Sequence, residues 1–255
     1  MLKLKKNLYG QKQGSRVWFI HLCDKILVLG YKQSKFDECI FYKGDLIFFF
    51  YVDDGIFLYP DKRKVDDAIK ELNHANMDLE DQGALADCLG INFAYQHDGS
   101  IIMSQPQLID QIIKDVNLKA NSHLLPIPTS ATGILQRELH TEPFSTKHTW
   151  SYRSIICKLN YLEKGTRADI TYATHQCAQF CEDPRSSYGR AVKNLVTYLM
   201  KTKNKGIILK PDRTKSLEVF ADADFLGNWN IKIAVDDAST EKSRTGYIMY
   251  MIATP

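Results

Sequence analysis

Two short apolar runs on either side of a pair of aspartates constrain the fold of this chain more than any other feature. Residues 46–52 are apolar and mostly β-branched or aromatic, and residues 56–59, which follow Gly55, have the same character. This pattern predicts strand, tight turn and strand, with Asp53 and Asp54 at the bend. Two interpretations of the pair are open. Adjacent carboxylates suit a divalent metal ion, and Asp54-Gly55 is also a common turn signal.

The composition is that of a folded chain that buries a sizeable core. The chain has 255 residues, of which 44% are hydrophobic and 25% are charged. No apolar stretch is long enough to cross a bilayer, and residues 1–6 lack the apolar segment of a secretory signal. We therefore expect an intracellular protein that is not secreted and has no membrane partner.

The six cysteines are scattered, without the paired spacing of a metal site. Cys177 and Cys181 lie four residues apart near His175, on one face of a predicted helix. This group is either half of a metal site or a set of buried helix-face thiols. The second interpretation is favoured, because no further ligand pair has a familiar spacing.

The start of the chain is basic, although the formal net charge is only +3. Tyr9 and Trp18 are interleaved with the basic residues, and the first sixteen residues include no acid. The segment suits a phosphate backbone with an aromatic ring stacked on a base or sugar, and it equally suits a solvated basic terminus. The basic residues are Lys3, Lys5, Lys6, Lys12 and Arg16.

Apolar periodicity predicts a mixture of helices and strands. A segment with three prolines and no sustained period, residues 121–145, predicts a linker or a long surface loop. The predicted helices are residues 18–29, 61–76, 105–116, 149–163, 170–181 and 186–200. Besides the aspartate hairpin, the predicted strands are residues 88–95, 100–103, 217–224 and 245–251.

An ordered series of motifs along the chain resembles the reverse transcriptase of copia-type retrotransposons, followed by the start of its RNase H region. Residues 4–13 (LKKNLYGQKQ) are similar to the family's LKKSLYGLKQ, and Tyr51-Val52-Asp53-Asp54 matches its YVDD box. The YRS, LNYL and TRADI segments at residues 152–154, 159–162 and 166–170 match a further series. Residues 222–224 and 243–247 resemble the opening of RNase H.

The resemblance implies an α+β fold with four parts. Residues 1–120 would form a partial polymerase palm with the YVDD β-hairpin, and residues 121–148 a linker. Residues 149–205 would form a helical thumb-like region. Residues 206–255 would form the opening strands of a truncated RNase H-like region.

The resemblance also implies RNA-directed DNA polymerisation by two-metal phosphoryl transfer, with Mg²⁺ as the cofactor. Asp53 would be the principal metal ligand and Asp54 the assisting one. The family's third carboxylate lies on a strand upstream of the tyrosine-glycine segment, and we expect it to be absent here, which leaves the site incomplete. In the RNase H-like region the first metal carboxylate would be Asp222. Asp236 and Asp237 would lie in a variable loop.

The expected partners are an RNA template, an RNA/DNA duplex, deoxynucleoside triphosphates and the missing parts of a polyprotein. The family's location would be the cytoplasm, in virus-like particles, or the nucleus. In the thumb-like region, Arg153, Lys158 and Arg167 are equally credible as surface charges or salt-bridge partners. The residues expected to bind nucleotide or nucleic acid are Tyr9, Gly10, Lys12, Gln13, Arg16, Tyr51, Arg153 and Arg167.

Two functional alternatives follow from the sequence. One is an enzyme fragment, and the other is a non-catalytic remnant or nucleic-acid-binding module. For the chain as given we expect no templated nucleotide incorporation with magnesium. One departure from the family pattern, Cys157 in place of a helix glycine, would crowd a packing contact by roughly 1–3 kcal/mol.

Overall fold

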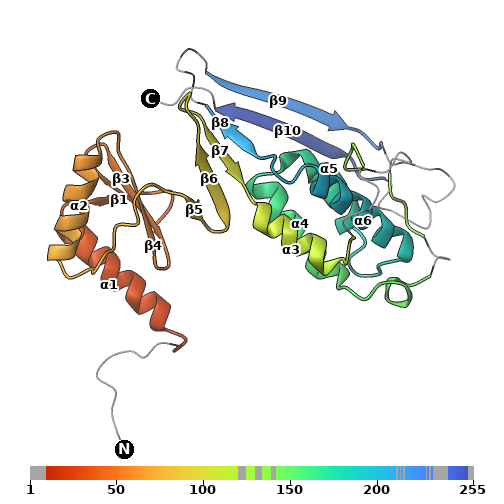
Figure 1. Ribbon diagram of the computed structural model, residues 1–255, viewed down its shortest axis with the longest axis horizontal. Coiled ribbons are helices and arrows are strands. Elements are labelled where there is room, and N and C mark those ends of the chain that lie inside the picture. The colour runs from red at the N-terminus through yellow and green to blue at the C-terminus, as the bar shows by residue number, and fades with distance from the viewer. Residues whose placement is uncertain are drawn as a thin grey trace, which may run out of the picture. The chain divides into compact units, whose positions relative to one another are not determined.

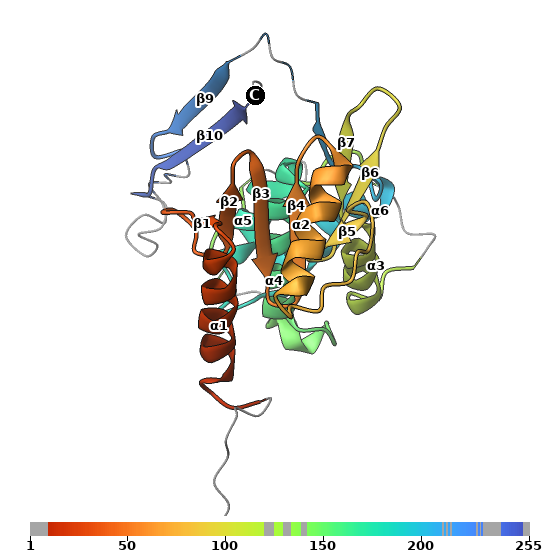
Figure 2. The ribbon, with the colours of Figure 1, turned by 90° about the vertical axis from the view of Figure 1, so that its left-hand side faces the viewer.

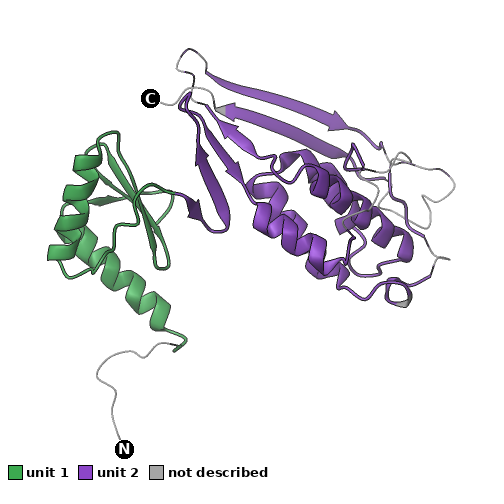
Figure 3. Cartoon of the chain, in the orientation of Figure 1, with its two compact units in different colours: residues 1–85 green, residues 86–255 purple. Residues whose placement is uncertain are grey.

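The structure is a computed structural model that describes residues 10–119, 125–129, 134–138, 142–210, 212, 214, 216–227, 229, 231 and 241–251. The chain divides into two compact units, residues 1–85 and 86–255 (Figure 3). Within the described residues the six α-helices and the antiparallel sheets confirm that the fold mixes α and β structure.

The first unit is a four-stranded antiparallel sheet with two helices (Figures 1 and 2). The strand order is β1-β2-β3-β4, so β4 lies at an edge of the sheet. The elements are α1 (Gly14–Val28), β1 (Lys32–Gln33), β2 (Ile40–Lys43), β3 (Leu46–Tyr51), β4 (Asp54–Leu58) and α2 (Lys62–His74).

The core of the first unit lies between the two helices and one face of the sheet. Phe48 and Phe50 alternate with outward residues along β3, so both rings point to the same face. Ile26 of α1 and Leu72 of α2 are fully buried in the same cluster. Burying each such side chain contributes about 1.5–3 kcal/mol. This packing fixes β3, which leads into the aspartate pair.

The second unit combines a second antiparallel sheet, a helical bundle and a separate hairpin. Its sheet has the order β5-β6-β7-β8, and among the described strands β9 pairs with β10 alone. The strands are β5 (Asp87–Cys88), β6 (Ile91–Tyr95), β7 (Ile101–Ser104), β8 (Ile207–Leu209), β9 (Leu217–Asp224) and β10 (Arg244–Met251). The helices are α3 (Pro106–Asp115), α4 (Tyr152–Gly165), α5 (Thr171–Ala178) and α6 (Ser186–Lys201), with short 3₁₀ turns η1 (Phe144–Thr146) and η2 (Ala168–Ile170).

The helices of the second unit share one apolar core. Ile109 and Ile112 of α3 pack with Leu159 of α4 and with Leu195 and Leu199 of α6, and all five are fully buried. In α6 the spacing of four residues between Leu195 and Leu199 places both on one helix face, as the periodicity predicts. The predicted helices therefore form, with ends that differ by a few residues.

The structure differs from the sequence expectation at two places in the second unit. Leu89 and Gly90 have positive φ angles of 53° and 73°, so the predicted strand 88–95 folds into a tight hairpin of β5 and β6. Strand β8 pairs with β7, with Ile207 opposite Met103. Residues 207–209 thus complete the sheet that begins with β5. The boundary between the two compact units falls between residues 85 and 86, before the expected linker.

Candidate functional site

The aspartate pair lies at the tip of the hairpin formed by β3 and β4. Tyr51 is opposite Asp54 in the register, so Val52 and Asp53 form a two-residue loop. Asp54 and Gly55 belong to β4, so the interpretation of Asp54-Gly55 as the turn itself is wrong. Val52 has a φ of 55°, which a β-branched residue rarely adopts. Backbone strain of this kind is typical of functional sites.

Both carboxylates are exposed. Because neighbouring positions of a strand alternate in direction, Asp54 shares a face with Tyr51, opposite the buried face of Phe48 and Phe50. Within the part of the chain that the structure describes, neither Asp53 nor Asp54 has a side-chain hydrogen bond or an ion pair. The pair is therefore free to accept ligands from solvent.

Aromatic packing supports the tip from behind. The rings of Phe48 and Phe57 stack across the two strands, with centroids 4.4 Å apart and an angle of 15°. Phe41 stacks on Phe50 from the neighbouring strand, at 5.9 Å and 19°. Such pairs contribute about 0.5–1.5 kcal/mol beyond their buried area. These ring contacts stabilise the part of the hairpin next to the loop of Val52 and Asp53.

Two adjacent carboxylates fit part of a magnesium coordination sphere. Mg²⁺ takes hard oxygen ligands, and it is usually held by one or two carboxylates together with water and substrate phosphates. Asp53 and Asp54 provide such oxygens, and no described residue of the chain competes for them. Among the described residues no group of three or more histidines, cysteines, aspartates or glutamates is arranged to hold a metal.

The basic start of α1 lies beside this hairpin. The ring of Trp18 meets Phe50 edge-on at 6.1 Å, and Phe19 meets the same ring at 5.9 Å. Arg16, one half-turn earlier, is exposed, as is Lys12 before the helix. Neither cation pairs with an acid among the described residues. Two other predicted binding residues, Gly10 and Gln13, precede the first residue of α1, and Tyr9 lies outside the described residues.

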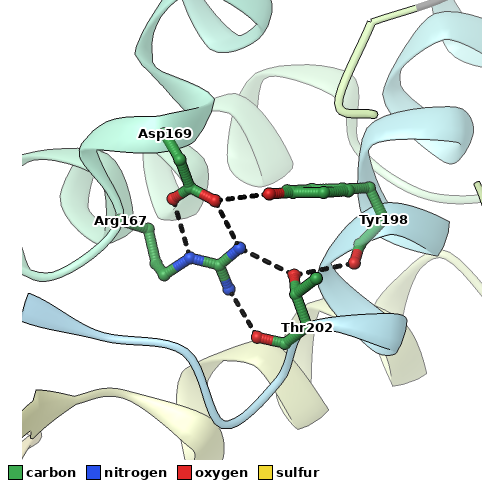
Figure 4. Close-up of polar contacts among 4 residues, drawn as sticks. All are labelled: Arg167, Asp169, Tyr198 and Thr202. Carbon is green, nitrogen blue, oxygen red and sulfur yellow. Dashed lines mark hydrogen bonds and ion pairs between the residues drawn. The ribbon is translucent and has the colours of Figure 1, made fainter. Parts of the chain in front are cut away.

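The two thumb arginines of the sequence analysis lie in different surroundings. Arg153 is exposed on the first turn of α4. Arg167 is only 1% exposed, and its guanidinium bonds to Asp169 and Thr202 (Figure 4). The expectation that Arg167 contacts nucleic acid is wrong, because a buried and fully engaged guanidinium is not available to a phosphate. The alternative of a salt-bridge partner holds for Arg167. It holds also for Lys158, whose Nζ lies 2.5 Å from Asp115.

Asp222 lies on β9 directly opposite Gly246 of β10. Because Gly246 has no side chain, the position facing Asp222 is open. Asp224, two residues on, is opposite Arg244. The side chains of β9 are all exposed. Asp236 and Asp237, which were expected in a variable loop, lie outside the described residues.

Cys177 and Cys181 pack against the helical core of the second unit. Cys177 is 3% exposed, and burial raises the pKa of its thiol to about 12. The hydroxyl of Tyr152 donates to the Cys177 carbonyl at 2.8 Å. The interpretation of buried helix-face thiols is therefore confirmed for Cys177, and Cys181 packs partly buried against the same core. Cys157 is exposed, so the expected crowding at this position is wrong.

Gly55 contributes to the site in a way that the sequence analysis did not predict. A side chain at Gly55 would meet the buried ring of Phe48, as a Cβ built there would lie 3.0 Å from Phe48 Cε2. The signal was present in the sequence, since an isolated glycine inside a strand marks a close approach of another group.

The chain belongs to the reverse transcriptase (RNA-dependent DNA polymerase) family, which matches residues 1–131, just over half of its length. The more specific resemblance to copia-type Pol polyproteins is also confirmed. The chain is 29% identical over 254 residues to the retrovirus-related Pol polyprotein from transposon RE1 of Arabidopsis thaliana, covering 98% of this chain and 16% of that protein. It is 26% identical over 257 residues to the corresponding polyprotein from transposon TNT 1-94 of Nicotiana tabacum, covering 96% and 18%.

The chain thus spans about a sixth of the length of these curated relatives. No solved structure matches it. Among the described helices, none combines the length and the apolar character that crossing a bilayer requires.

Proposed function

We propose that this chain is a segment of a copia-type retrotransposon polymerase that synthesises DNA on an RNA template. Its contribution would be the carboxylate pair Asp53 and Asp54. The observation that carries the proposal is the exposed hairpin tip inside the region that matches the reverse transcriptase family, where no described residue bonds to either carboxylate. We assign the first unit to the polymerase palm, the helices α4 to α6 to a thumb, and β9 and β10 to the opening of an RNase H-like region.

Magnesium bound at these carboxylates would neutralise the charge of a nucleoside triphosphate and activate a primer hydroxyl. The residues of the chain would do the positioning. Phe48 and Phe57 fix the base of the hairpin, so that Asp53 in the loop and Asp54 in the strand face solvent together. Lys12 and Arg16 would hold phosphates beside them.

A specific observation supports a second function, that of a nucleic-acid-binding module without catalysis. Lys12, Arg16 and Arg153 are exposed and have no acidic partner among the described residues. Free cations of this kind attract a phosphate backbone whether or not a metal binds. RNA/DNA duplex is the ligand expected for both functions.

Two measurements on the full chain separate these functions. The first is a titration with Mn²⁺, followed through the broadening of the NMR signals of the hairpin amides. The second is the retention of a labelled RNA–DNA duplex at low and at raised salt. The polymerase proposal expects broadening at Asp53 and Asp54 together with salt-sensitive duplex binding, and the broadening should disappear in the Asp53→Asn/Asp54→Asn variant.

A matched control is Asp45→Asn, which removes an exposed carboxylate from the turn at the other end of β3. It should leave the broadening unchanged. Duplex binding without metal binding would overturn the polymerase proposal in favour of the binding module. The absence of both would remove the two functions and leave an inert remnant.

A further inference from the structure

We infer that Gly55 and Phe48 form a size-matched pair that positions the Asp54 carboxylate. The inference rests on the proposed function, since it concerns the same hairpin. A Cβ at Gly55 would lie 3.0 Å from Phe48 Cε2 and 3.5 Å from Cζ. The first distance is shorter than ordinary van der Waals contact between carbon atoms, about 3.5–4.0 Å. The ring of Phe48 thus fills the space that any side chain at position 55 would need.

The ring of Phe48 is packed on several sides and has little space in which to move away from position 55. It is 2% exposed and is stacked on Phe57 with centroids 4.4 Å apart. Phe50 lies 6.1 Å from it, and Tyr31 meets it at a steep angle of 68° and 6.5 Å. Interiors packed in this way transmit a displacement and do not absorb it. A methyl group at position 55 would therefore have to move something other than the ring.

The element that gives way is β4. In the described sheet, β3 is held between β2 and β4, whereas β4 has a neighbour on one side only. An edge strand loses fewer ladder hydrogen bonds when it shifts, so a Cβ at Gly55 should push β4 away from Phe48. Asp54 is the next residue along this strand, and its carboxylate would move with the backbone.

Asp53 would not follow to the same extent, because it lies in the loop and not in β4. The two carboxylates would then lose their relative placement. Metal and catalytic groups have to be held within about 0.5 Å of their working geometry, and a misplacement of about 1 Å costs on the order of 100-fold in function. A shift of a few tenths of an ångström should therefore weaken metal binding about three- to tenfold.

The test is the Mn²⁺ titration of the full chain, read from the amide signals of Asp53 and Asp54. Gly55→Ala should bind Mn²⁺ about three- to tenfold more weakly than the unsubstituted chain. Phe48→Leu combined with Gly55→Ala should recover most of the loss, because the shorter side chain vacates the contact. Gly246→Ala is the matched control. Gly246 is also a strand glycine next to an aspartate, since it lies opposite Asp222. A Cβ at Gly246, however, would meet no atom within 4 Å.

Each result has a distinct meaning. If the unsubstituted chain shows no Mn²⁺ effect at the hairpin, the proposed metal site falls and this inference falls with it. If the unsubstituted chain and Gly55→Ala bind Mn²⁺ equally well, the positioning role of Gly55 is overturned while the metal site stands. If Gly55→Ala does not fold, a folded and binding double variant supports the pair, and a double variant that binds no metal overturns it.

Discussion

The guanidinium of Arg167 holds both carboxylate oxygens of Asp169, with 2.8 Å from Nε to Oδ1 and 2.8 Å from Nη2 to Oδ2. The remaining donors reach the end of α6, where Thr202 accepts at its carbonyl (3.0 Å) and at its hydroxyl (2.7 Å). Tyr198 completes the network by donating to Asp169 at 2.7 Å. Figure 4 shows these four residues joined around the guanidinium. The network ties the turn after α4 to the last turn of α6.

Replacing Arg167 with methionine should destabilise the chain. Removing one partner of a buried ion pair costs about 3–5 kcal/mol. The Asp169 side chain is 38% exposed, so water replaces part of the interaction with Arg167 that its carboxylate loses. We therefore expect the free energy of unfolding to fall by about 2–3 kcal/mol. Urea unfolding measures the change. Arg153→Met, on the exposed side of α4, is the control and should stay within about 0.5 kcal/mol. Equal midpoints for the two variants would contradict a structural role for Arg167.

The sequence alone predicts the parts of this fold in which a local pattern decides. Residues 46–51 become β3 because they form a continuous apolar run, mostly aromatic, that ends next to the Asp53-Asp54 pair. Residues 62–74 become α2 because their apolar positions repeat with the helical period of 3.6. It does not predict β1, which is only the two residues Lys32–Gln33 and owes its existence to pairing with β2. Nor does it predict the burial of Arg167, since arginine is mostly exposed and the Thr202 partner lies 35 residues away.

At the hairpin tip, too, the sequence predicts some features and not others. The aromatic runs predict a hairpin, and the matched motif predicts the importance of Asp53 and Asp54. The sequence does not predict the position of the loop, because Asp54-Gly55 is a strong turn signal and Val52 is a poor one. Packing decides it: Gly55 has to lie in the strand, opposite Phe50 and against the ring of Phe48.

Gly165→Ala should destabilise the second unit by about 1–3 kcal/mol, the usual range for overpacking. A Cβ at this last residue of α4 would lie 2.5 Å from Gln105 Oε1. Gln105 is fully buried, and its Oε1 accepts a hydrogen bond from the Thr166 hydroxyl at 3.0 Å. Urea unfolding again measures the effect. Gly246→Ala, with open space at its Cβ, should show no such loss, and a matching loss there would point to a general cost of replacing glycine.

Cys157 and Cys177 should differ sharply in their reaction with iodoacetamide. The thiolate is the nucleophile, and burial both raises the pKa of Cys177 to about 12 and shields its sulfur. Cys157 is exposed on α4. At mildly alkaline pH, peptide mapping by mass spectrometry should find Cys157 alkylated and Cys177 unmodified. Both should react in urea. Rapid native labelling of Cys177 would show that the core around it opens.

His148 lies in an apolar corner against α6. Its ring stacks on Phe144 with centroids 4.6 Å apart, and Trp150 lies 5.5 Å away. Both ring nitrogens are shielded from solvent, and within the described residues no hydrogen bond of ordinary geometry reaches them. Gly189 allows the close approach, since a Cβ there would lie 2.6 Å from His148 Nε2. A proton on this ring would place a charge where it cannot be solvated.

Acid should therefore weaken the chain through His148. Burial first, and then the charge of Lys193, lower the pKa of His148 below its ordinary value of about 6.5. As the pH falls, the imidazole of His148 is protonated in the unfolded chain before it is protonated in the folded chain. The free energy of unfolding is therefore highest above about pH 6.5 and decreases as the pH falls below that value. Urea unfolding at about pH 7.5 and about pH 5.5 tests this. His148→Phe should lose less stability between the two conditions than the unsubstituted chain, whereas His97→Gln, at an exposed turn, should lose as much. An unchanged difference in His148→Phe would show that this ring does not set the acid sensitivity.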